Sequence, residues 1–521
     1  MKRKMFFIPL LILAFISKPS FSSQAEPLSL SLEDCILKAL ENNLQVAVEV
    51  YNPELADVSL TRAKEEFMPR FDLSYGSEQT ESPSYWWIQG AETVATDYMD
   101  YSVSILQNIP TGGQFSLSLS GYKSDSNQSF QLINPRFGNT LRFNFIQPLL
   151  RNFGFKVSRK EILLAQNNFD ISLHQLQSVL LETIYRVQQA YWNLVYAIEN
   201  HKVKNQSLKL ARDLLAKSKK EVEVGKLAPI EILNAQAVVA SREADILQAE
   251  ALIRSNEDLL KNIINISEEV VSPQKIVPVD EPTLEEREIS LEEALSMAYQ
   301  KRPDLKMKKT DIENKELNLG VAKNQMLPGL DLNFSYWSPG LSGDRLIYLH
   351  DNPLTGVVVG KEEGSAANSL RDALNLLYNN WSVSVTLSLP LSNILTRADY
   401  VRAKMELEKS HIELENTQKQ ALLEVKDAVR EIETSAKRVQ AYRVARELAE
   451  KRLEAEEKKL KVGLTTNYFV LQYQEELANA RSQELKALVD YNLAWAKLEK
   501  ALGISLDKRN ISISRFSDSE Q

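Results

Sequence analysis

The spacing of hydrophobic residues along the chain predicts two very long helices. Between residues 422 and 439, and again between residues 184 and 198, apolar side chains recur at steps of three and four. Such steps place apolar side chains along one face of a helix and are typical of coiled coils. We predict helices over about 155–222 and about 397–460, each roughly 100 Å long at a rise of about 1.5 Å per residue.

Four shorter helical segments accompany the long helices. They cover about 32–67, 229–264, 291–326 and 467–502. Each has about 36 residues, a length of roughly 54 Å, so two of them placed end to end match one long helix. We therefore expect each half of the chain to form a two-layered helical rod.

Between the helical segments the hydrophobic period changes to two, which predicts strands. Apolar residues alternate with polar ones over 382–391, and also over 71–75, 141–147 and 330–336. Alternation over about ten residues is typical of strands in a membrane barrel, although an ordinary half-buried sheet alternates in the same way. Aromatic residues of the kind that line membrane interfaces lie nearby: Tyr85, Trp86, Trp87, Tyr98, Tyr101, Trp337, Tyr378 and Trp381.

The chain is a tandem repeat. Ser31-Leu32-Glu33-Asp34 matches Ser290-Leu291-Glu292-Glu293, and a second block places Gly225 on Gly463 and Gln236 on Gln474. Self-similarity of this kind indicates one structural unit built twice. We predict a signal peptide over 1–25, a first repeat over 26–266, a linker over 267–289, a second repeat over 290–506 and a polar tail over 507–521.

The first residues have the pattern of a secretory signal peptide. Lys2, Arg3 and Lys4 precede an apolar run of 12 residues, Met5 to Ile16, and small and polar residues follow. A run of this length is too short to cross a bilayer, which takes about 20 residues. No later segment offers about 18 consecutive apolar residues, so entry into a membrane would require strands closed into a barrel.

Composition and charge exclude several classes of function. The chain has 62 basic and 70 acidic side chains, a net charge of −8, which argues against a nucleic-acid binder. Its one cysteine, Cys35, excludes an intrachain disulfide, and the residues before it do not resemble a lipidation signal. The four histidines are scattered, and no phosphate-binding loop or hydrolase motif is present, so we predict no catalytic residues, no metal site and no cofactor.

Two ordered copies of several motifs resemble the TolC family of outer membrane efflux proteins. In the second repeat, Leu291-Glu292-Glu293-Ala294 precedes Arg302-Pro303-Asp304-Leu305, close to the family's Asn-Pro-Asp-Leu. The family's Val-Gly turn and the helix start that follows it occur at 224–236 and again at 462–474. The resemblance covers nearly the whole mature chain.

This resemblance implies a mixed α and β fold. The strands of a homotrimer would share one outer-membrane β-barrel, continued by a long periplasmic α-helical barrel and built from two tandem structural repeats. The implied function is a passive exit duct in the cell outer membrane, part of a tripartite efflux or type I secretion system. Its partners would be outer membrane lipid, a periplasmic adaptor (membrane fusion) protein and an inner-membrane transporter.

The number of barrel strands depends on a further hairpin in the first repeat. Apolar alternation over 101–109 precedes a Thr111-Gly112-Gly113 turn, and alternation over 115–119 follows. If this hairpin joins the sheet, a trimer has eighteen strands; if it folds aside, the trimer has the family's twelve. Because the smaller number pairs the two repeats symmetrically, we predict twelve.

The resemblance also identifies candidate sites at the two Val-Gly motifs. In family members these helix-turn-helix tips face the adaptor, which makes the following residues docking candidates: Val224, Gly225, Lys226, Leu227, Val462, Gly463, Leu464 and Thr465. The alternative is that both glycines only end helices in a left-handed conformation.

A periplasmic gate is the second implied site. Family members often carry acids six and nine positions after the second glycine, where this chain has Phe469 and Gln472. Glu231, six positions after Gly225, would form a threefold acidic ring instead. The alternative is a solvated charge that the helix dipole favours.

A periplasmic coiled-coil adaptor or scaffold without a transmembrane barrel is the alternative function. It would share the signal peptide and the heptads, but it would not need strands with one lipid-facing side.

Overall fold

The structure is a computed structural model that describes residues 28–266, 275–285 and 289–512. The predicted signal peptide, residues 1–25, lies outside the described residues. So do part of the predicted linker, 267–274 and 286–288, and most of the predicted tail, 513–521.

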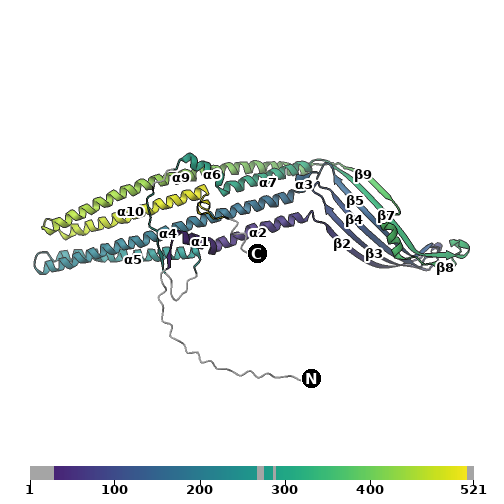
Figure 1. The fold of residues 1–521 in the computed structure, drawn as a ribbon, viewed down its shortest axis with the longest axis horizontal. Helices are drawn as coiled ribbons and strands as arrows, with labels where there is room; N and C mark the ends of the chain where they lie inside the picture. The colour runs from purple at the N-terminus through teal and green to yellow at the C-terminus, as the bar shows by residue number, and fades with distance from the viewer. Residues whose placement is uncertain (1–27, 267–274, 286–288, 513–521) are drawn as a thin grey trace, which may run out of the picture. The chain divides into compact units, whose positions relative to one another are not determined.

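Helices make up most of the described chain (Figure 1). The helices are α1 Leu32–Asn42, α2 Leu44–Glu65, α3 Phe155–Ser158, α4 Lys160–Glu223, α5 Ile230–Ile264, α6 Leu291–Lys301, α7 Pro303–Gln325, α8 Ala366–Leu374, α9 Ile394–Lys461 and α10 Asn467–Leu502. The strands are β1 Leu28–Leu30, β2 Arg70–Pro83, β3 Thr93–Asn108, β4 Gln114–Ser126, β5 Ile133–Pro148, β6 Ile276–Pro278, β7 Gly329–Tyr348, β8 Val358–Glu362 and β9 Asn380–Ser388.

The two long predicted helices are confirmed as α4 and α9. The predicted segments 32–67 and 291–326 are each two helices rather than one, and the prediction of a single helix there is wrong. The breaks fall at Asn43 and Arg302, whose ψ angles are both 124°. Arg302 precedes Pro303, whose ring disfavours a helical conformation at the preceding residue. The side chain of Asn43 accepts a hydrogen bond from the Gln45 N–H at 2.9 Å, which caps α2.

The chain divides into two compact units, and each repeat contributes to both. Of the described residues, unit 1 contains 28–47, 180–266, 275–285, 289–293 and 425–501, and unit 2 contains 48–179, 294–424 and 502–512. Unit 1 therefore holds the ends of the long helices that lead into α5 and α10, and unit 2 holds the sheet.

Unit 1 is built around the heptad positions of its helices. On α4, Ile184, Val187, Tyr191 and Leu194 are fully buried, as the sequence spacing predicts. On α9, Val425 and Val439 are also fully buried. Burial of one apolar stripe per helix supplies the main stabilisation of such a helical bundle. The short strands β1 and β6 pair in parallel within this unit.

Unit 2 contains one antiparallel sheet. The strands β2, β3, β4, β5 and β7 follow one another as neighbours; β9 pairs with the first part of β7 and β8 with its last part. All four strand segments predicted from the sequence lie in this sheet. The last segment is shorter than predicted, because β9 ends at Ser388, two residues before Pro390, which lacks a backbone N–H.

The prediction that the hairpin at Thr111-Gly112-Gly113 folds aside from the sheet is wrong. It forms β3 and β4, which pair with each other and also with β2 and β5. This arrangement gives both hairpin strands a partner on each side and so satisfies their backbone hydrogen-bonding groups. Within the described residues, one chain therefore contributes six long strands to the sheet: β2, β3, β4, β5, β7 and β9.

The register gives the sheet one apolar and one polar face. On the apolar face, one row across the strands consists of Phe71, Ile105, Leu117, Phe143, Tyr336 and Trp381. The neighbouring row on the polar face consists of Asp72, Ser104, Ser118, Arg142, Trp337 and Asn380. In these two rows the apolar or polar character continues across six strands, apart from Trp337, although the residues come from both repeats.

The short helix α8 covers one end of the apolar face. Asn139 on β5 donates a hydrogen bond to the Ser369 hydroxyl of α8 at 2.6 Å, and both side chains are buried. Gly340 on β7 lies against the backbone of Ser369, so that even a methyl group would collide there. The apolar rows nearer the other end of the strands remain uncovered by α8.

Among the described residues, no helix combines the length and the apolar character that crossing a bilayer requires. In the same part of the chain, His, Cys, Asp and Glu side chains nowhere gather in threes around a potential metal position.

Candidate functional site

Both predicted turns belong to unit 1, and both lie at the same end of its helices (Figure 1). The first turn, residues 224–229, connects α4 to α5, and the second turn, residues 462–466, connects α9 to α10.

The two turns have the same backbone geometry. Gly225 has a φ of 71° and Gly463 a φ of 77°, so both are left-handed, as predicted. In each turn the glycine N–H bonds the carbonyl three residues back, and the next residue's N–H bonds the carbonyl five residues back. This is the Schellman arrangement that ends a helix at glycine. An added Cβ would meet no atom within 4 Å at either position, so the need for glycine comes from the backbone conformation alone.

Apolar side chains are exposed around both turns. The exposed fraction is 67 % for Val224, 70 % for Val462 and 77 % for Leu464. Ile230 and Leu233 beside the first turn, and Tyr468 and Phe469 beside the second, are also exposed. We call these seven residues the apolar tip. A concentration of exposed apolar side chains at one end of a bundle is typical of a surface that another protein covers.

The helices behind the turns pack into one core. Its buried members come from all four helices: Leu208, Ala211 and Leu214 from α4, Ala235 and Val239 from α5, Ala449 and Leu453 from α9, and Val470, Leu471, Leu477 and Ala480 from α10. A buried hydrogen bond of 2.8 Å from the Asn467 amide to the Ser218 hydroxyl joins α10 to α4 close to the turns. The two hairpins are therefore held together near their tips.

Arg242 is a buried polar side chain that bonds to two neighbouring helices. It lies on α5 and is only 6 % exposed. Its guanidinium donates to the carbonyl of Ser207 on α4 at 2.7 Å and to the carbonyl of Leu471 on α10 at 2.8 Å. Burial lowers the pKa of Arg242, because a charge costs free energy in an apolar surrounding. The residue thus bridges three helices through charge-assisted hydrogen bonds rather than through an ion pair.

The second turn is held by a buried carboxylate. Glu456 on α9 is 7 % exposed and accepts hydrogen bonds from the Thr465 hydroxyl and, at 3.0 Å, from the Lys459 ammonium. The bond from Thr465, followed by the bond from Lys459, holds the pKa of Glu456 below the usual range of glutamate. Thr465, predicted as a docking residue, therefore also has a structural role.

We expect this contact to make the second turn sensitive to acid. The folded-state pKa of Glu456 is lowered, so its stabilisation is present above the ordinary glutamate pKa of about 4.3 and is lost as the pH falls through the lowered value. Hydrogen exchange of the amides of residues 462–466 should therefore be faster at pH 3 than at pH 7 after correction for intrinsic rates. Glu456→Gln should abolish most of that difference, whereas Glu457→Gln should retain it. An unchanged difference in Glu456→Gln would show that the carboxylate does not hold the turn.

The predicted gate residues lie beside the turns, but in the described structure no hydrogen bond or ion pair joins their side chains. Glu231 is half-buried in the first turn of α5, where the helix dipole favours an acid. Phe469 and Gln472 are exposed near the start of α10. The Phe469 ring packs edge-on against the Tyr468 ring, with 5.5 Å between the ring centroids. No hydrogen bond or ion pair joins Glu231 to either of them in the described structure.

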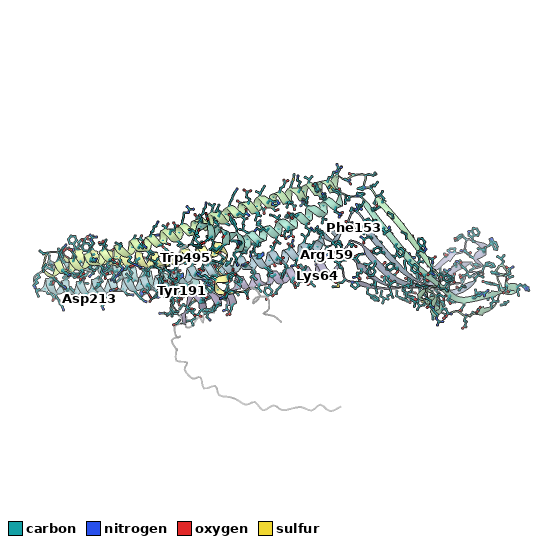
Figure 2. All side chains as sticks on the ribbon, turned by 45° about the horizontal axis from the view of Figure 1, so that its top comes forward. Lys64, Phe153, Arg159, Tyr191, Asp213 and Trp495 are labelled. Carbon is teal, nitrogen blue, oxygen red and sulfur yellow. The ribbon has the colours of Figure 1, made fainter. Side chains whose placement is uncertain are left out.

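A second polar cluster in unit 1 was not predicted from the sequence. The Tyr191 hydroxyl (Tyr191 is labelled in Figure 2) donates to the Asp280 carboxylate at 2.7 Å, and the same carboxylate accepts the Leu32 N–H at 2.7 Å. Burial, followed by the hydrogen bond to Asp280, raises the pKa of Tyr191, so the phenol stays neutral and able to donate. The cluster ties the start of α1 to α4 and to the predicted linker. Its partners lie 89 and 248 residues apart, a separation that sequence spacing does not reveal.

Sequence comparison identifies relatives that are named for secretion and nodulation. The alkaline protease secretion protein AprF of Pseudomonas aeruginosa is 28 % identical over 151 residues, which is 29 % of this chain and 31 % of that protein. The match thus spans about a third of that relative. The nodulation protein T of Rhizobium leguminosarum bv. trifolii is 20 % identical over 392 residues, 75 % of this chain and 76 % of that protein.

Solved structures of outer membrane channels share the fold. The CmeC channel of Campylobacter jejuni superposes with a TM-score of 0.63 at 16 % identity, covering 93 % of this chain and 90 % of that one. The open state of the MtrE channel of Neisseria gonorrhoeae gives a TM-score of 0.59 at 18 % identity, covering 96 % and 97 %. At these identities the likeness establishes the fold.

The family model for outer membrane efflux proteins matches residues 114–265 and 294–504, which include the strands β4, β5, β7 and β9, both helix turns and most of both repeats. This match covers well over half of the chain, and the chain therefore belongs to the outer membrane efflux protein family.

Proposed function

We propose that the protein is the exit duct of a tripartite efflux or type I secretion system. Family membership makes it an outer membrane efflux or secretion channel and not an enzyme. The observation that carries the proposal is the presence in one chain of a two-faced sheet of six long strands and two helical hairpins. A coiled-coil adaptor without a barrel is not favoured, because it has no use for an apolar row that crosses six strands.

The proposed assembly is a homotrimer. Six long strands are fewer than the eight of the smallest membrane barrels, so several chains must combine to remove the open edges. Three protomers with six strands each would give eighteen. This number replaces the twelve expected from the sequence, because the β3–β4 hairpin belongs to the sheet.

The distribution of charge supports an assignment of the two faces of the sheet. Arg142 and Asp72 lie in one polar row, whereas the row of Phe71, Ile105 and Leu117 carries no charge. An arginine on the lipid side of a barrel costs about 2–4 kcal/mol at the bilayer centre. We therefore assign the apolar face to the outer membrane lipid and the polar face to a water-filled lumen, and we assign the helical part of the chain to the periplasm.

We assign the docking of a periplasmic adaptor, which links the duct to the inner-membrane transporter, to the apolar tip and the turns that carry it. This surface includes the residues predicted from the sequence, Val224 to Leu227 and Val462 to Thr465. The exposed side chains of Val224, Val462 and Leu464 support the assignment. The two Schellman turns provide a rigid backbone for this surface.

The test replaces Leu464, which is 77 % exposed, by aspartate. We expect Leu464→Asp to assemble normally and to lose at least tenfold in affinity for the adaptor of the host's own export system, because a charge would be buried in an apolar interface. Binding is measured with both purified proteins in detergent. Thr466→Asp is the matched control, since it adds the same charge to the same turn without removing apolar surface. Equal affinities for both variants would contradict docking through the apolar tip.

We assign Glu231 to an acidic ring at the periplasmic entrance, with Phe469 and Gln472 lining the same opening. Glu231 makes no hydrogen bond or ion pair with another described side chain, so its charge is free to act on passing ions. Glu231→Gln should leave trimer assembly intact and reduce the cation preference of single-channel currents in planar bilayers, read from the reversal potential in a salt gradient. Glu243→Gln, an exposed acid of α5 that pairs with Arg212, is the control. Unchanged cation selectivity in Glu231→Gln would contradict the acidic ring and leave Glu231 as a solvated charge that the helix dipole favours.

A further inference from the structure

We propose that Arg142 and Trp337 form a binding site for aromatic carboxylates on the polar face of the sheet. The inference deepens the proposed function, on which it rests, because that function makes the polar face the wall of the lumen. Aromatic acids would then be a class of cargo that the duct contacts on its way out.

The two side chains are held together by the strand register. Arg142 on β5 and Trp337 on β7 are direct cross-strand partners. The Cζ atom of Arg142 lies 5.3 Å from the centroid of the Trp337 ring, within the range of a cation–π contact. Trp337 is a large aromatic ring on a face that is otherwise composed mainly of serine, threonine and asparagine, so packing of an apolar core does not explain its position.

The charge of Arg142 has no carboxylate partner in the described structure. Asp72 lies in the same row, but three strands away, roughly 14 Å at the usual strand spacing. Asp72 is moreover bound by Arg70 at 3.0 Å. The side chains next to Arg142 on its face, Ser118, Thr140 and Asn144, are uncharged. An exposed guanidinium on an indole ring, without an acid to neutralise it, is a ready site for an anion.

The chemistry of the pair selects planar aromatic anions. A guanidinium that rests on a ring keeps the N–H groups of its edge available, and these match the two oxygens of a carboxylate. The ring system of the same ligand can then lie against the indole. A second arginine lies over an aromatic ring further along β5. The Cζ atom of Arg136 is 5.4 Å from the centroid of the Tyr122 ring, and the centroids of the stacked Tyr122 and Tyr98 rings are 5.7 Å apart. The pairing of arginine with an aromatic ring therefore recurs on this face.

The test measures binding of 2-naphthoate to the purified full-length protein in detergent by isothermal titration calorimetry. Three variants are compared with the unaltered protein. Arg142→Gln removes the charge, and Arg142→Lys keeps the charge but loses the paired N–H groups that match a carboxylate. Trp337→Leu removes the aromatic ring. Lys123→Gln is the matched control, because Lys123 lies on the opposite face of the same sheet. The neutral 2-naphthalenemethanol and the non-aromatic cyclohexanecarboxylate serve as control ligands.

We expect 2-naphthoate to bind the unaltered protein more tightly than either control ligand does. Arg142→Gln and Trp337→Leu should each raise the dissociation constant about tenfold, Arg142→Lys should raise it by less, and Lys123→Gln should leave it unchanged. No binding to the unaltered protein, or the same dissociation constant in Arg142→Gln, would overturn the site. Calorimetry does not depend on ion conduction, so absence of single-channel current in planar bilayers would count against the proposed channel and not against this site.

Discussion

Replacing Arg242 by alanine is expected to lower the free energy of unfolding by about 3 kcal/mol, since hydrogen bonds to a charged group contribute about 1.5–3 kcal/mol each and a buried stem is lost as well. The guanidinium joins Ser207 of α4 to Leu471 of α10, so its loss removes one polar link between the two hairpins. Urea denaturation of the detergent-solubilised protein, followed by far-ultraviolet circular dichroism, measures the change.

Two further variants distinguish the contribution of the hydrogen bonds of Arg242 to the free energy of unfolding from the contribution of its side-chain volume. Arg242→Met retains an apolar stem and avoids a buried charge, so it should cost less than Arg242→Ala. Arg212→Ala removes an exposed arginine of α4 that pairs with Glu243, and should cost less than about 1 kcal/mol. If Arg242→Ala were no more destabilising than Arg212→Ala, the carbonyl bridge would not contribute to the stability of unit 1.

Placing an arginine at Ile105 is expected to prevent most of the protein from assembling in the outer membrane. Ile105 lies on the apolar face of β3, between Phe71 and Leu117, and is 40 % exposed in the single chain. A cation on the lipid side of a barrel costs about 2–4 kcal/mol at the bilayer centre, enough to reduce the assembled fraction by more than tenfold. The yield of trimer in the outer membrane fraction measures this effect.

The neighbouring position provides the matched control. Ser104 precedes Ile105 on the same strand, but it lies on the polar face, beside Asp72. Ser104→Arg should therefore assemble at nearly normal yield, because its charge faces water and an acid. Loss of assembly in both variants, or in neither, would contradict the assignment of the apolar face to lipid. The same pair tests the β3–β4 hairpin, since a hairpin outside the barrel wall would tolerate arginine at either position.

Local sequence patterns were sufficient for the two long helices, the location of the main strands and the two glycine turns, but not for the breaks at Asn43 and Arg302. Steps of three and four predicted α4 and α9 to within a few residues at most of their ends, apart from the first turn of α4, where Arg159 separates the short α3. Alternation predicted the strands, and Gly225 and Gly463 predicted left-handed turns that the φ angles confirm. These features depend on backbone geometry and on the period with which apolar side chains repeat, both of which are local properties of the chain.

Only the tertiary structure decided how those elements combine. The β3–β4 hairpin could fold aside or join the sheet with the same sequence, and the choice depends on backbone partners from β2 and β5. The bridge of Arg242 to Leu471, the Tyr191–Asp280 cluster and the pairing of Arg142 with Trp337 join residues that are 229, 89 and 195 positions apart. The first two contacts form because folding buries polar groups that must then find partners, and the third follows from the pairing of β5 with β7. One sequence carries no periodic signal for partners that distant.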